Sequence, residues 1–144
     1  MAEAAATVPL TRTARLGLAA AAAFLLVGFA TAAWLRPDPS GLGTHRQLGL
    51  SACSAKTLFG VPCPSCGLTT SLSHVMHGQL ADAWRVQPVG VFIAAASAIA
   101  LLVCGEAAIG GRWRLPIGPL ALAVAAVWTI NVVAIARWIV VVLM

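Results

Sequence analysis

The sequence has little charge. Only 9% of its 144 residues are Asp, Glu, Lys or Arg, and only four of these are acidic. Globular proteins carry about 25% charged residues, so an ordinary water-exposed surface is excluded. Tyrosine is absent, hydrophobic residues make up 60% of the chain, and the mean hydropathy is +0.94. This composition excludes a soluble globular domain and a disordered chain, and it indicates an integral membrane protein.

Familiar catalytic signatures are also lacking. The chain has no glycine-rich nucleotide loop, no H-E-x-x-H pair and no G-x-S-x-G elbow. Its four cysteines are too few for a disulfide-dense scaffold. The net charge is +5, which in a soluble protein would suggest a nucleic-acid partner. Here the nine basic residues lie near apolar runs, so they are interpreted as membrane-flanking charges and no nucleic-acid partner is expected.

Three apolar runs predict an all-α protein with three transmembrane helices, forming a single membrane domain over residues 1–144. The expected spans cover about 16–35, 87–104 and 116–140. The first run has 20 residues, which as a helix is about 30 Å long and matches one bilayer core. A signal peptide is the alternative interpretation of this run, and it leaves open whether residues 1–33 are partly cleaved.

The distribution of basic residues favours one orientation. With three spans, the N-terminus and the loop 105–114 share a side, and the basic residues there lie tightly against the helices. The positive-inside rule therefore favours an inside N-terminus and places the loop 37–85 outside. The close-lying basic residues are Arg12, Arg15, Arg112 and Arg114.

The loop 37–85 contains all three histidines and three of the four cysteines. Within it, Cys63 and Cys66 form a C-x-x-C pair flanked by Pro62 and Pro64. The prolines stiffen the backbone, and Gly67 permits close backbone contact, so the segment is predicted to form a rigid knuckle. Such a pair suits a disulfide, a reactive dithiol or two of four metal ligands.

An apolar residue at every fourth position predicts an amphipathic helix from about Ser65 to Arg85. On its polar side, His74 and His77 would lie about 12 and 16 Å from Cys66 along a continuous helix, too far to share one zinc ion with it. A better candidate set of metal ligands combines Cys53, Cys63 and Cys66 with His45 or a water. If a metal ion is bound, zinc is the expected ion. A position at a helix N-terminus also predicts a stabilised thiolate at Cys66.

Polar residues in the third span are expected to have specific roles, because polar groups at membrane depth are costly. Asn131 is predicted to form a hydrogen bond to another helix, and Arg137 to extend to a lipid headgroup. Cys104, at the end of the second span, is interpreted as a small apolar residue.

The motif residues together follow one pattern: a cysteine, then G-[IV]-P-C-P-x-C-G-x-T, a short helix, a Gly-x-[LW] element and a proline that opens the next span. In this chain the pattern corresponds to Cys53, the segment Gly60–Thr69, the segment Gly78–Leu80 and Pro88. The stretch resembles the small bacterial membrane proteins of Domain of Unknown Function family 2752. Many members carry Arg where this chain has Thr70. The resemblance implies a multi-pass protein of the bacterial cytoplasmic (inner) membrane and implies no particular activity.

Three functional hypotheses follow, and the sequence leaves open whether the protein is an enzyme. In the first, the knuckle is held by a disulfide or a metal ion and forms a binding or accessory module for a membrane protein partner or lipid. In the second, Cys66 is the nucleophile of a thiol–disulfide redox protein, with Cys63 or Cys53 resolving. In the third, His74 and His77 serve an enzyme that modifies a lipid or a small molecule.

Overall fold

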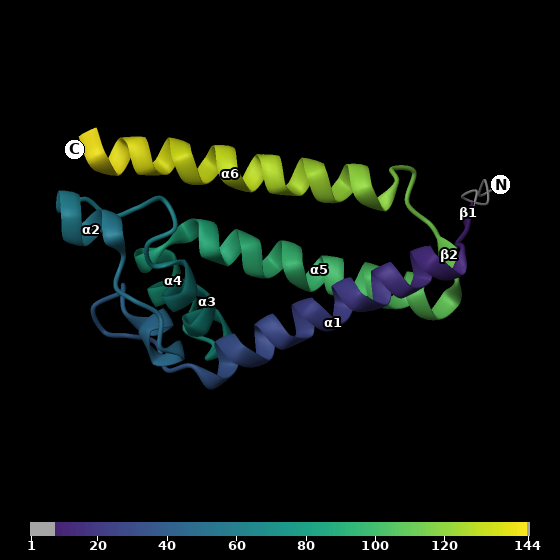
Figure 1. The fold of residues 1–144 in the computed structure, drawn as a ribbon, viewed down its shortest axis with the longest axis horizontal. Helices are drawn as coiled ribbons and strands as arrows, with labels where there is room; N and C mark the ends of the chain where they lie inside the picture. Colours follow the sequence, from purple (N-terminus) through teal and green to yellow (C-terminus); the bar gives the residue numbers. More distant parts are fainter. Residues whose placement is uncertain (1–7, 144) are drawn as a thin grey trace.

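Three long helices dominate the computed structural model, which describes residues 8–143 (Figure 1). They are α1 (Arg12–Trp34), α5 (Pro88–Gly110) and α6 (Pro119–Leu143). All three are long and apolar enough to cross a membrane. The predicted all-α membrane fold with three spans is therefore confirmed.

The three spans pack unequally. α5 lies between α1 and α6 and runs in the opposite direction to both (Figure 1). In the most apolar stretch of α1 and of α5, 17% of the residues are buried inside the protein, whereas none is buried in α6. Accordingly, Asn131 donates its hydrogen bond to the Val127 carbonyl of its own helix at 2.8 Å. The predicted interhelical bond is wrong, because Asn131 is exposed and its amide bonds to a carbonyl of its own helix.

The N-terminus and the α5–α6 connection meet at one end of the molecule. Here β1 (Val8–Pro9) pairs antiparallel with β2 (Arg112–Trp113). The Arg15 guanidinium donates hydrogen bonds to two backbone carbonyls in the last turn of α5, at 2.9 and 3.1 Å. Glu106 forms an ion pair with Arg114 at 2.7 Å. The strand pairing and the Arg15 hydrogen bonds fasten α1 to α5 at this end, and the ion pair fastens the segment after β2 to α5.

The loop between α1 and α5 folds at the opposite end (Figure 1). It contains a 3-10 helix, η1 (Thr44–Leu48), followed by α2 (Ser54–Phe59), α3 (Leu68–Met76) and α4 (Leu80–Val86). The amphipathic helix expected over 65–85 is thus two helices. Gly78 has a φ of 75°, and its N–H donates to the Val75 carbonyl, so the backbone turns there. The helix also begins later than expected, because Gly67 has a φ of 84°.

The polar side of α3 is the side that is buried. Thr70, Ser71 and Ser73 are at most 1% exposed, whereas Leu80 and Trp84 of the expected apolar stripe are more than half exposed. The hydroxyls replace water as partners of backbone carbonyls: Ser71 Oγ lies 2.8 Å from the Gln87 carbonyl. Ser73 Oγ donates to the Leu35 carbonyl at 2.6 Å. α3 is therefore joined to the ends of α1 and α4 by hydrogen bonds rather than by apolar packing alone.

Replacing Ser73 with alanine is expected to lower the free energy of unfolding by about 2 kcal/mol, because the buried Leu35 carbonyl loses its donor. Denaturation of the purified protein in detergent micelles would measure this change. Ser51→Ala is the control, since Ser51 is exposed. Equal stability of the two variants would show that the buried hydrogen bond contributes nothing.

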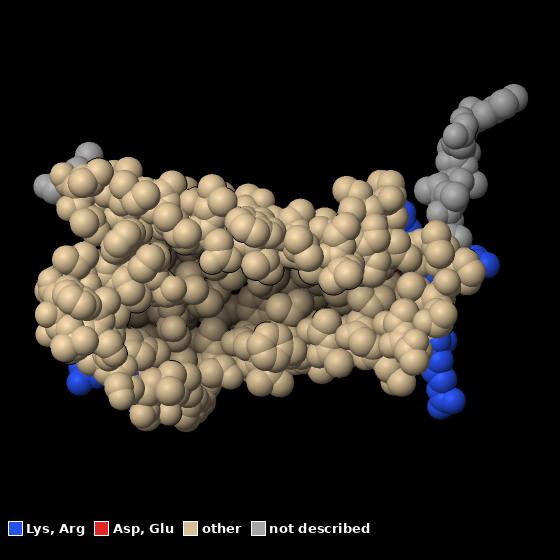
Figure 2. Space-filling model, turned by 45° about the horizontal axis from the view of Figure 1, so that its top comes forward, with Lys and Arg blue, Asp and Glu red and all other residues tan. Residues whose placement is uncertain are grey.

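The surface agrees with a membrane environment. Figure 2 shows Lys and Arg at the two ends of the molecule and a long flank without charged residues between them. The chain is thus a multi-pass membrane protein in shape and surface chemistry, and the folded loop lies at one end of its membrane-facing flank.

Candidate metal centre

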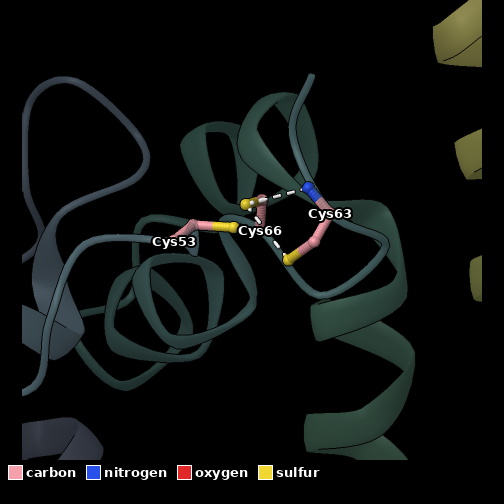
Figure 3. A group of neighbouring side chains, drawn as sticks. All are labelled: Cys53, Cys63 and Cys66. Atoms are coloured by element: carbon pink, nitrogen blue, oxygen red, sulfur yellow. Dashed lines mark hydrogen bonds between the residues drawn. The ribbon is translucent and has the colours of Figure 1, made fainter. Parts of the chain in front are cut away.

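Three cysteines from separate parts of the loop come together beside α3 (Figure 3). Cys53 caps the N-terminus of α2, while Cys63 and Cys66 lie in the turn that leads into α3. Their Sγ atoms all lie within 4.8 Å of one another. The Sγ atoms of Cys63 and Cys66 are 3.2 Å apart.

The turn from Cys63 to Gly67 is closed by its own backbone. The N–H of Cys66 donates to the Cys63 carbonyl at 3.0 Å, and the N–H of Cys63 donates to Cys66 Sγ at 3.2 Å. The left-handed conformation of Gly67 lets the chain pass directly from this turn into α3. An N–H directed at a sulfur favours a negatively charged sulfur, which is the state that a metal ligand requires.

Two membrane spans support the turn through its prolines. The Pro62 carbonyl accepts a hydrogen bond from Trp138 Nε1 of α6 at 2.6 Å. The Pro64 carbonyl accepts one from Gln87 Nε2 at the start of α5 at 3.1 Å. Gln87 is 2% exposed, and its Oε1 has no partner in the described part of the chain. Neither hydrogen bond was predicted from the sequence, since neither joins sequence neighbours.

The thiols of Cys53 and Cys66 differ in acidity. The backbone N–H of Lys56, together with hydrogen bonds from Cys66 and Cys63, lowers the pKa of Cys53 to about 6. Burial and hydrogen bonds with Cys63 and Cys53 raise the pKa of Cys66 to about 12. The stabilised thiolate predicted at Cys66 is therefore found at Cys53. The reason is that Gly67 caps α3, so Cys66 precedes the helix, and its sulfur is turned into the cluster.

In the reduced, metal-free protein, iodoacetamide at pH 7.5 is expected to alkylate Cys53 well before Cys66, because the thiolate is the nucleophile. The rate at Cys53 should be nearly constant above pH 7 and fall as the pH drops through about 6. Peptide mapping by mass spectrometry at short reaction times would measure the order. Earlier labelling of Cys66 would contradict this assignment of the charge.

The histidines lie outside the cluster. His45 Nε2 is 3.1 Å from the Ser51 carbonyl. His74 Nδ1 is 2.6 Å from Gln79 Oε1, and His77 Nδ1 is 2.8 Å from the Ser73 carbonyl. The last two contacts lie where α3 ends. The structure therefore brings the three cysteines together without any of the three histidines.

The sequence also singled out Thr69 and Cys104. Thr69 lies half-buried in the first turn of α3. Cys104 packs beside Leu18, Ala107 and Trp113 near the opposite end of α5, in an apolar setting.

The spacing of the sulfurs suits a metal ion. Zinc–sulfur bonds of about 2.3 Å in a tetrahedron place two sulfurs about 3.8 Å apart. The sulfurs of this cluster lie close to that separation, with 3.2 Å for one pair and an upper limit of 4.8 Å for all. A disulfide would join two of the three cysteines and leave the third without a role, whereas a metal ion would bind all three.

Comparison with known proteins supports the resemblance seen in the sequence. Residues 53–101 match the model of the family described as a protein of unknown function, DUF2752. The matched region covers the three cysteines, α3, α4 and the first part of α5. No curated protein and no solved structure matches the chain.

Proposed function

We propose that the chain is a binding module of the bacterial cytoplasmic membrane whose Cys53, Cys63 and Cys66 together hold a zinc ion. The convergence of the three sulfurs carries this proposal. Zinc prefers thiolate ligands, and three of them leave one tetrahedral position for a water or an external ligand. The ion would hold α2 against the turn before α3 and so preserve the outer shape of the loop.

The shape of the loop supports a role in binding a membrane protein partner. A cavity of about 360 Å³ lies beside Cys63 and is lined by apolar side chains of α2 and α6, including Phe59, Trp138 and Val142. On α2, Leu58 and Phe59 are 75% and 77% exposed. Exposed apolar side chains beside an apolar cavity are typical of surfaces that bind a partner.

Native mass spectrometry of the detergent-purified protein, prepared without reductant or chelator, tests the proposal. Zinc held by thiolates should add about 63 Da to the mass of the chain, since the ion replaces two protons. A photo-crosslinker at position 59 should then capture a membrane protein, and capture should decline when a chelator removes the metal. Loss of about 2 Da per chain, with no metal, would instead indicate a disulfide.

A second function is favoured by the short Cys63–Cys66 distance of 3.2 Å. In this case the two thiols would reduce a partner's disulfide. One thiolate attacks it, forms a mixed disulfide and releases one partner sulfur as a thiolate; the second cysteine then attacks the mixed disulfide, closes the Cys63–Cys66 disulfide and releases the partner with both sulfurs reduced. A Cys63→Ser variant should then accumulate mixed disulfides with its partner. Absence of such species on non-reducing gels would remove this alternative. No contact of His74 or His77 favours the third hypothesis, a lipid- or small-molecule-modifying enzyme.

A further inference from the structure

A groove of about 590 Å³ separates α5 from α6 within the uncharged flank. Figure 2 shows that this flank is hollowed along its length. The groove is lined almost entirely by apolar side chains. They include Val89, Phe92 and Ala96 of α5, and Ala126, Ile130 and Val133 of α6. In a bilayer, such a groove accommodates an acyl chain rather than water.

Arg137 lies on the same side of α6 as the groove. The intervals from Ala126 to Ile130, Val133 and Arg137 are four, three and four residues, which places all four on one helix face. Arg137 is half-buried. The two ion pairs within residues 8–143 join Arg85 to Asp82 and Arg114 to Glu106. Arg137 therefore lies on the helix face that lines the groove, and no carboxylate within residues 8–143 forms an ion pair with it.

The depth of Arg137 suits a lipid headgroup. Val133 shares the groove with Val89, which is the second residue of α5. Arg137 lies one helical turn, about 6 Å, beyond Val133 toward the cysteine loop. The next residue, Trp138, is bonded to Pro62 of that loop. Arg137 thus lies where the second span begins and the apolar flank ends.

We propose that the α5–α6 groove is a binding site for an anionic phospholipid. One acyl chain occupies the groove, and the phosphate pairs with the Arg137 guanidinium. The charge of Arg137 selects anionic over zwitterionic headgroups, as basic residues between spans do. None of the residues that form this site is one of the three cysteines, so the lipid proposal does not depend on whether the cluster binds zinc.

Lipid retention tests this site. The full-length protein is reconstituted in nanodiscs of equal parts phosphatidylglycerol and phosphatidylcholine, extracted in mild detergent and measured by native mass spectrometry. Wild type should retain one phosphatidylglycerol. Arg137→Gln should weaken this retention about fivefold. Ala126→Leu, which fills the groove but keeps the charge, should lose retained lipid of both kinds.

Arg36→Gln is the matched control. Arg36 is an exposed cation that directly follows the C-cap residue of α1, and α1 lies on the opposite side of α5 from α6 (Figure 1). It should retain phosphatidylglycerol as wild type does. If Arg36→Gln and Arg137→Gln lose equal amounts of phosphatidylglycerol, the retention reflects general attraction between the basic protein and anionic lipid. That result would overturn the proposed site. A second result would also overturn the site: a wild-type dimer that the Ala126→Leu substitution dissociates while the lipid stays bound. In that case a second copy of the chain, and not a lipid, would occupy the groove.

Discussion

Replacing Cys66 with serine is expected to leave the protein without bound zinc, with its zinc affinity lowered more than about a hundredfold. Loss of a residue that only orients a ligand costs about 10–100-fold in affinity, and Cys66 would be a ligand itself. Its sulfur also accepts the N–H of Cys63 and lies 3.2 Å from Cys63 Sγ, so two interactions within the cluster disappear together. Metal analysis of the purified protein, followed by competition with a chelator of known affinity, would measure the effect.

Cys104→Ser provides the control for this experiment. Cys104 packs with Trp113 near the opposite end of the molecule, so its replacement should leave the zinc content unchanged. Because zinc would bind only the folded loop, wild type should also lose thermal stability when the metal is removed. Cys66→Ser should already have that lower stability. A Cys66→Ser variant that keeps a full equivalent of zinc would refute the three-cysteine centre.

Replacing Gly67 with alanine is expected to destabilise the protein by about 3 kcal/mol, from two separate causes. The first is conformational, since Gly67 has a φ of 84°, where a side chain costs about 1–2 kcal/mol. The second is steric, because an added Cβ would lie 3.0 Å from Val86 Cγ1 and 3.2 Å from the Gly41 carbonyl oxygen. Unfolding in detergent micelles, together with zinc content, would measure the loss.

Gly60→Ala separates the two causes. Gly60 has a φ of 70°, similar to that of Gly67, but its Cβ would meet no atom within 4 Å. It should therefore cost only the conformational part, about 1–2 kcal/mol. If the two substitutions destabilise the protein equally, the close packing of Gly67 against Val86 has no energetic weight.

The spans were predictable because each is a local run of predominantly apolar residues. Arg12 and Arg36 bracket the first apolar run, and the bilayer requires about 20 such residues in any spanning helix. The break at Gly78 was not predictable from periodicity, because the apolar spacing continues through it. An isolated glycine is tolerated in many helices, and only tertiary contacts determine whether the chain turns there.

The burial of the polar side of α3 could not be predicted from periodicity. The apolar stripe over 65–85 fits either the membrane interface or packing against the spans, and lipid accepts the exposed Leu80 and Trp84 of α4 at little cost. The interior then contains the hydroxyls that satisfy the ends of neighbouring helices, such as Ser73 with the Leu35 carbonyl. The bond between Trp138 and Pro62 spans 76 positions, beyond the reach of any local pattern.

The loose packing of α6 has a consequence for the movement of this helix in the plane of the bilayer. No residue of its most apolar stretch is fully buried in the rest of the protein, and the hydrogen bond to Pro62 attaches its C-terminal half to the loop. Separating α6 sideways from α5 therefore costs little packing energy, because lipid chains then pack against the face of α6 that is uncovered. Lateral separation of the third span from α5 is therefore resisted mainly at its two ends, by the short connection from β2 and by the hydrogen bond to Pro62.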